Sequence, residues 1–272
     1  PNFIFEGALG KNNQFIHQFN SPLSTRGTQG TWLISQEQIP VVNSFSSQIS
    51  SHWKMHKHEY SISLYQRNSE GHFNFEKYLS PIPILSKQNE YENQHYKESQ
   101  GREKINGAEV LIRKRNSLIN GWISYHFNET KYSFPNINDG NLYKADHDLK
   151  HEFKSVLITS FLNWDVTTSW SYSSGRVFTH ENDIDKTNDF QIIFDSGSRN
   201  KQRLPSIHHL DLSVSKIYKL MDFEINTGLS IYNIYNRKNI SHKRYNPYTS
   251  GKILSDVIML GTTTTIFIEV KI

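Results

Sequence analysis

The residues of this chain best suited to chemistry are acidic side chains and histidines that lie close together in the sequence. One short segment contains Asp146, His147, Asp148 and His151. Imidazole and carboxylate groups suit zinc and similar ions. The alternative is a polar loop that meets a strand, in which each side chain has its own partner or contacts water. We favour the polar loop, so the sequence predicts no metal site here.

Two other groups of histidines lead to the same interpretation. His52, His56 and His58 flank a predicted tight turn and alternate in the direction they face, which is typical of a solvated turn. His208 and His209 are neighbours in a predicted strand, so they point to opposite faces and cannot bind one ion together. The histidine pattern therefore gives no ligand set.

No catalytic motif is recognisable in the chain. It contains no cysteine, which excludes disulfides, cysteine-ligated zinc and thiol catalysis. There is no glycine-rich phosphate loop, and Ser173–Arg176 resembles the end of a strand more than a nucleophile elbow. The sequence thus predicts a protein without an enzymatic site, a metal or a cofactor.

Composition limits the class of protein further. Charged residues make up 21% of the 272 positions, mean hydropathy is −0.63, and no segment approaches the roughly 18 to 20 apolar residues of a membrane helix. A β-barrel stays possible because its strands alternate lipid-facing with lumen-facing residues. The net charge of +4 is scattered among both signs, which argues against nucleic-acid binding. The sequence starts at Pro1 and contains no signal-peptide pattern, so we expect either processing or a missing N-terminal part.

Strand patterns dominate the chain. In Asp222–Tyr235 apolar residues occupy one face and polar residues the other, and Ile207–Ile217 and Thr264–Ile272 repeat the pattern. Further candidates are Phe3–Leu9, Phe45–Lys54, Glu59–Asn68, Asn106–Lys114, Leu118–Tyr132, Lys150–Leu162 and Trp164–Ser174. The sequence therefore predicts an all-β fold with about nine strands in this chain.

The connections between these segments alternate between short and long. Short links are Met55–His58, Arg115–Ser117, Asn163 and Lys219–Met221; long links are Gly10–Asn43, Ser69–Ile105, Ser133–Leu149, Gly175–Ser206 and Asn236–Asp256. Several structureless loops of this length are uncommon in compact soluble domains. They are a regular feature of antiparallel transmembrane β-barrels, which have short periplasmic turns and long extracellular loops.

Aromatic residues near the predicted strand ends are consistent with a membrane barrel. They are Trp53, Tyr60, Trp122, Tyr125, Trp164, Trp170, Tyr172, Tyr232 and Tyr235. Amphipathic rings are favoured at lipid headgroups. The opposite faces carry Glu109, Arg113, Asp211, Glu224 and Glu269, which we interpret as a hydrated inner wall.

A barrel of this kind would be incomplete. About nine strands is an odd number, whereas single-chain bacterial barrels have even numbers. An open sheet in lipid would leave backbone groups unpaired at several kcal/mol each. We therefore expect further strands N-terminal to Pro1.

Several sequence segments resemble the closing strands of TonB-dependent outer-membrane receptors. They are "NGAEVLIRK", "NGWISYHFNETKYSF", "DHDLKHEFKSVLITSFLNWDVTTSWSYSSGRVFT", "RLPSIHHLDLSVSK" and "LSIYNIYNRKNI", in the family's order. Asn13–Phe45, Ser61–Phe75 and Ile258–Ile272 look like the subgroup with a carboxypeptidase-regulatory-like N-terminal domain. Ile272 departs from the family, which prefers an aromatic final residue.

The resemblance implies that residues 1–272 form the C-terminal part of a receptor barrel of about 22 strands. The plug and the N-terminal strands would be absent from this piece. The expected location is the cell outer membrane, with membrane lipid, the rest of the receptor and the TonB-ExbB-ExbD system as partners and a surface lipoprotein as a further candidate. No nucleic-acid partner is expected.

The function implied is active uptake of a scarce or bulky nutrient, such as a siderophore, cobalamin, a glycan or a peptide. Candidate ligand-binding residues lie in the predicted extracellular loops: Tyr78, Tyr91, Tyr96, Phe178, Phe190, Tyr245 and Tyr248. Two alternatives stay open. One is a secreted, soluble β-sandwich that binds carbohydrate, and the other is a barrel subunit or adhesin in a surface complex.

Overall fold

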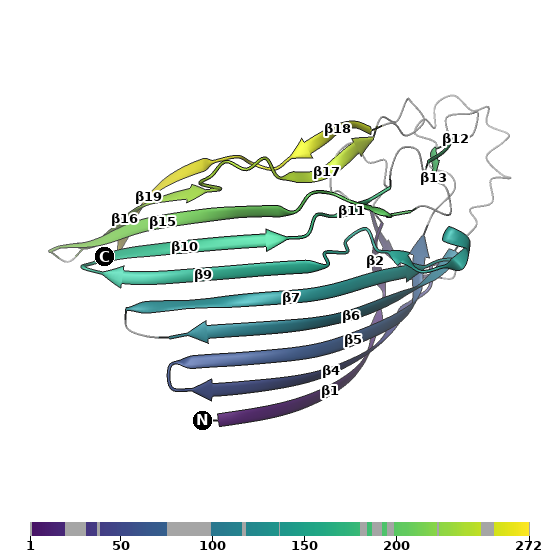
Figure 1. Cartoon of the computed structure of the whole chain (residues 1–272), viewed down its shortest axis with the longest axis horizontal. Coiled ribbons are helices and arrows are strands. Elements are labelled where there is room, and N and C mark those ends of the chain that lie inside the picture. The colour runs from purple at the N-terminus through teal and green to yellow at the C-terminus, as the bar shows by residue number, and fades with distance from the viewer. Residues whose placement is uncertain are drawn as a thin grey trace.

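The chain forms one large, curved antiparallel sheet in a computed structural model (Figure 1). The structure describes residues 2–19, 31–36, 39–74, 99–115, 118–135, 137–179, 184–186, 192–194, 199–221, 223–245 and 253–271. The long strands are β1 (Asn2–Gln14), β4 (Val42–Met55), β5 (His58–Asn74), β6 (Ser99–Lys114), β7 (Ile119–Ser133), β9 (His151–Phe161), β10 (Trp164–Ser173), β15 (Ile207–Leu220), β16 (Phe223–Tyr232) and β19 (Thr263–Lys271).

These ten strands follow one another in the sheet in chain order, and β8 (Tyr143–Lys144) adds a short piece beside β7. All ten segments predicted from the alternation are strands, so the all-β antiparallel fold is confirmed. About nine strands were expected and the described residues contain ten long ones, so the argument from an odd number does not apply to these ten strands. Within the described residues the path is open, because β1 and β19 each have a strand on one side only.

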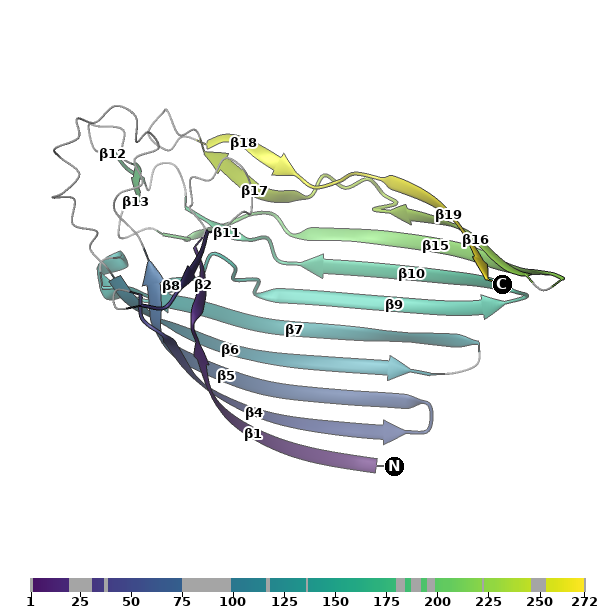
Figure 2. The same ribbon diagram turned by 180° about the vertical axis from the view of Figure 1, so that it is seen from behind.

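The alternation of short and long connections is also confirmed. Short turns join β4 to β5, β6 to β7, β9 to β10 and β15 to β16 at one end of the sheet, and the strand ends that the long connections join lie at the other (Figure 2). The turn between β9 and β10 is as tight as a hairpin allows, with Leu162 and Asn163 at positive φ. We call the two ends of the sheet the turn end and the loop end.

The long connections are less irregular than the sequence suggested. They contain the pairs β2 (Ile16–Phe19) with β3 (Thr31–Ile34), β11 (Val177–Phe178) with β14 (Gln202–Arg203), β12 (Ile184–Lys186) with β13 (Ile192–Phe194), and β17 (Ile240–Tyr245) with β18 (Ile253–Ile258). A short 3-10 turn, η2 (Asn138–Gly140), precedes β8. These pairs are too short to give a clear periodicity in the sequence.

The register of the strands separates the side chains into a polar and an apolar face. Residues directly opposite each other in a sheet share a face. Ser213, Ser230 and Thr265 are opposed across β15, β16 and β19, whereas their sequence neighbours continue a row of Val214, Leu229 and Ile266. Glu109, Arg113, Asp211, Glu224 and Glu269, expected on a hydrated inner wall, all lie on the polar face by register.

The apolar face is exposed in this structure. Leu9, Ile266 and Ile268 retain 78%, 77% and 70% of their accessible surface, and many other large apolar side chains are similarly open. The buried hydrophobic cluster of the described residues contains only Phe134, Ile137 and Tyr143, at the loop end. A soluble domain would bury its apolar face in a second layer, and the described part of the chain supplies no such layer to the ten-strand sheet.

Two aromatic residues differ from their expected positions. Trp122 lies opposite Arg113 and so belongs to the polar face, whereas Tyr232, opposite Thr263 at the end of β16, is on the polar face as the alternation predicts. Tyr235 lies beyond the end of β16, after a turn at Asn233 with positive φ. No helix in the described ranges is long and apolar enough to cross a membrane.

Candidate functional site

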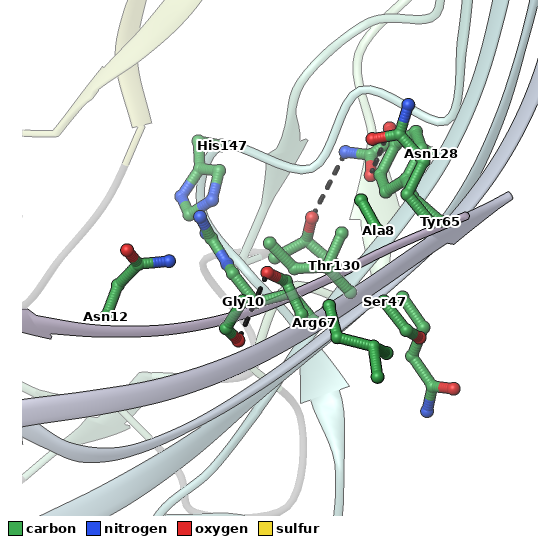
Figure 3. Close-up of a pocket in the computed structure, with 14 residues that line it drawn as sticks. Ala8, Gly10, Asn12, Ser47, Tyr65, Arg67, Asn128, Thr130 and His147 are labelled. Carbon is green, nitrogen blue, oxygen red and sulfur yellow. Dashed lines mark hydrogen bonds between the residues drawn. The ribbon is translucent and has the colours of Figure 1, made fainter. Parts of the chain in front are cut away.

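A pocket of about 580 Å³ opens on the polar face near the loop end, over β1 and β4 to β7 (Figure 3). Its charged or titratable side chains are Arg67, His147 and Tyr65, and Asn12, Gln48, Asn128 and Thr130 contribute amide and hydroxyl groups. Alternate positions of each strand supply these groups, because a strand turns every second side chain to the same face. The pocket can therefore offer hydrogen bonds of both kinds and one permanent positive charge.

Arg67 is fixed at the pocket by a buried carboxylate. Its Nη2 atom lies 3.0 Å from Oε2 of Glu103, which is only 4% exposed. Two histidines also approach the Glu103 carboxylate: Nε2 of His72 lies 3.7 Å from Oε2, and Nε2 of His147 lies 3.9 Å from Oε1. His147 belongs to the connection between β8 and β9, so this cluster joins the loop end to the sheet wall.

Tyr65 lines the pocket. Its ring covers Gly107 on the neighbouring strand, where a Cβ atom would come within 2.1 Å of the ring. Only glycine leaves room for that approach. Beyond it, Nδ2 of Asn128 donates to Oγ1 of Thr130 at 3.1 Å. This packing fixes the positions of the phenol and amide groups that face the interior.

The loop beside the pocket is anchored by Asp148, which is 1% exposed. Its Oδ1 atom accepts from the backbone N–H of Thr130 at 2.9 Å, and its Oδ2 atom accepts from Nη2 of Arg203. Nη1 of Arg203 donates to the carbonyl oxygens of Asp148 and Gly175 at 3.0 and 2.7 Å. Two long connections are therefore held to β7 by one ion pair.

A second anchor lies outside the first. Nδ2 of Asn200 donates to Oδ1 of Asp146 at 2.6 Å and to the carbonyl oxygen of Lys144 at 2.9 Å. The guanidinium of Arg199 lies 5.5 Å from the ring centre of Tyr143. Burial lowers the pKa of Arg199 to about 10, so its charge is retained at neutral pH.

Asn239 links the loop after β16 to β15 by side-chain hydrogen bonds. It is 1% exposed, its Oδ1 atom accepts from the N–H of His208 at 3.1 Å, and its Nδ2 atom donates to the carbonyl oxygen of His208 at 2.9 Å. The side-chain amide thus makes the two hydrogen bonds to the His208 backbone that a neighbouring strand would otherwise make.

Replacing Asn239 with Ala is expected to lower the local opening free energy at His208 by about 2 kcal/mol, because a buried donor and acceptor lose their partners. Hydrogen exchange of the His208 amide in the folded protein measures the effect. Lys238→Gln, next to it, is the control and should leave that exchange unchanged. Unaltered protection in Asn239→Ala would contradict this role.

The four residues considered as metal ligands are separated by the fold. Asp146 bonds to Asn200, Asp148 to Arg203, and His147 faces Glu103, while Nδ1 of His151 lies 2.8 Å from the Tyr125 hydroxyl. Of the residues that the structure describes, no group of three or more His, Cys, Asp or Glu side chains is placed to hold a metal ion.

The other histidines also have separate environments. His52 lies 3.6 Å from Glu6, and His58 stacks on Tyr60. His208 contacts Tyr235 on one face and His209 contacts Asp211 on the other, as their alternation predicted.

Most of the proposed ligand-binding aromatics lie outside the described residues: Tyr78, Tyr91, Tyr96, Phe190 and Tyr248. Phe178 is half-buried in β11, with the Lys243 ammonium 5.7 Å from its ring centre. For Tyr245 the structure describes only the backbone, at the end of β17. The pocket residues Arg67 and Thr130 are not among the residues predicted from the sequence, although strand alternation places both on the polar face.

Taken together, the geometry is that of a section of β-barrel wall: a single curved antiparallel sheet, polar on the face with the pocket and apolar on the other. Tight turns lie at one end and long, mutually anchored connections at the other. This arrangement positions groups for binding along its polar face.

No known family model matches the chain, and no curated protein matches it in sequence. Its fold is similar to the crystal structure of the ferric yersiniabactin uptake receptor FyuA from Yersinia pestis, with a TM-score of 0.56 and 11% sequence identity. The likeness covers 98% of this chain and 34% of that chain, so the chain spans about a third of the receptor's length. At this identity the comparison shows the fold alone, an antiparallel β-barrel wall.

Proposed function

We propose that this chain is the C-terminal part of the barrel of a TonB-dependent outer-membrane receptor that takes up a scarce or bulky nutrient. A siderophore, cobalamin, a glycan or a peptide fits this role. The observation that carries the proposal is the exposed apolar face, which continues across all ten strands while the opposite face is polar. In water such a face costs about 25 cal/mol for each Å² of apolar surface, whereas lipid solvates it.

The open edges support the same proposal. β1 and β19 present backbone groups that have no strand partner among the described residues, and in hydrocarbon each unpaired group costs several kcal/mol. We propose that further strands of the receptor pair with both edges and close the barrel, to about 22 strands in all. The plug would occupy the interior and connect the receptor to the TonB-ExbB-ExbD system.

Ligand contacts are proposed at the loop end. The polar-face pocket with Arg67 and His147 opens there, and the aromatic loop residues, including Phe178 and Tyr245, belong to the connections at the same end. A surface lipoprotein could cover these connections. The soluble β-sandwich alternative receives no support from a single-layer sheet.

Site-directed spin labelling tests the proposed membrane location, and this cysteine-free chain suits it. Labels at Leu229→Cys and Ile268→Cys in the full-length receptor should be accessible to oxygen and protected from a polar nickel chelate, because these positions face lipid. Labels at Ser230→Cys and Glu269→Cys, one residue further along the same strands, should show the reverse. Equal exposure of both sets to the chelate would overturn the proposal.

A further inference from the structure

Lysines form a row across neighbouring strands on the apolar face, which faces outward in the proposed barrel. The row lies at the loop end, just beyond the band of apolar side chains on that face. Lys104 of β6 lies opposite Lys131 of β7, and Lys131 lies opposite Lys144 of β8. Residues paired in this way share a face, with Cβ atoms about 4.5–5.5 Å apart. We call Lys104, Lys131 and Lys144 the basic rung.

The basic rung marks a sharp change in the chemistry of the outward face. On β7 the outward residues run from Ile123 through Tyr125 and Phe127 to Glu129 and Lys131. On β6 they run from Ile112 through Val110 and Ala108 to Asn106 and Lys104, in step with β7. On both strands the lysine is therefore the second outward-facing residue beyond the last apolar one. A lipid headgroup would meet the wall at this level.

More positive charge surrounds the basic rung than negative charge. Lys11 lies on the same row of the sheet through Phe45 and Asn68, and the Lys150 ammonium lies 5.9 Å from the centre of the outward-facing Phe127 ring. Glu129 is 3.0 Å from Lys131, and Glu70 is 3.3 Å from Arg102. Among the described residues no carboxylate forms an ion pair with Lys11, Lys104, Lys144 or Lys150.

Like charges directly opposite in a sheet repel each other, so the basic rung is stabilised when anions lie between its ammonium groups. We propose that the rung binds the phosphate groups of the glycolipid in the outer leaflet, while the acyl chains of the same lipid contact the apolar band beneath. This inference rests on the proposed function, because the outward face must lie in a bilayer with the loop end outside the cell.

Lipid retention by the full-length receptor tests the inference. The receptor is placed in phosphatidylcholine nanodiscs containing either lipid A with its phosphates or dephosphorylated lipid A, and the lipid that co-purifies is quantified by mass spectrometry. The wild type should retain the phosphorylated lipid preferentially. The variant K104Q/K131Q/K144Q should lose that preference by on the order of ten- to a hundred-fold, since each lysine near an anionic surface contributes about a factor of five.

The matched control is K57Q/K114Q/K219Q, which removes three lysines from the turn end and should retain lipid A as the wild type does. Equal loss in both variants, equal retention of both lipids, or displacement by inorganic phosphate at ordinary ionic strength would overturn the inference. So would unchanged lipid retention with lost binding of an acidic surface protein, which would assign the rung to a protein partner. A receptor that enters no bilayer would instead contradict the proposed function itself.

Discussion

Arginine in place of Leu229 is expected to destabilise the membrane-inserted receptor by about 2–4 kcal/mol, the cost of a cation on the lipid face near the bilayer midplane. Leu229 lies between Val214 and Ile266 in the outward row, inside both ends of β16. Urea unfolding of the full-length receptor in liposomes, followed by tryptophan fluorescence, measures the change in the free energy of unfolding.

This substitution also distinguishes lipid from water as the surroundings of the apolar face. Leu229 is 40% exposed in the structure, and at such a position in a water-soluble protein an arginine usually changes stability by only about 0.5 kcal/mol. Thr265→Arg is the control, because it places the same charge on the polar face, next to Ile266, the residue that pairs with Leu229. Similar, small effects of both substitutions would contradict a lipid-facing Leu229.

The sequence predicts the sheet well wherever the two faces differ in polarity. Phe223, Ile225 and Leu229 alternate with polar residues, and β16 forms over them. The ends of strands are less predictable, because beyond the apolar band both faces are polar. In β5 the alternation stops after Leu64, yet pairing with β6 continues to Asn74; backbone hydrogen bonds extend the strand there.

The contacts at the loop end are not predictable from the sequence. Asp148 and Arg203 lie 55 positions apart in the sequence and meet only because β9, β10 and the connection to β15 bring them together. A pattern read along the chain records which residues share a strand face but not which loops meet. For this reason Asp148 was considered as a metal ligand, and Arg203 was not singled out.

Methionine in place of Arg203 is expected to weaken the loop end by about 3–5 kcal/mol, because it leaves the buried carboxylate of Asp148 without its cation. The carbonyl oxygens of Asp148 and Gly175 lose a donor at the same time. The backbone N–H of Thr130, which donates to Asp148, reports this change directly. Its hydrogen exchange in the folded receptor should become faster, while amides in the middle of β7 stay protected.

The double variant Arg203→Met/Asp148→Asn separates the ion pair from simple packing. The amide that replaces the Asp148 carboxylate keeps an acceptor for the Thr130 N–H but carries no charge, so the double variant should recover much of the protection lost in Arg203→Met alone. The two substitutions are thus expected to be strongly non-additive. Additive effects, or unchanged exchange at Thr130, would mean that the two connections are held to β7 by other contacts. The position of His147 beside Glu103 would then not depend on the ion pair, and the pocket would keep its shape without it.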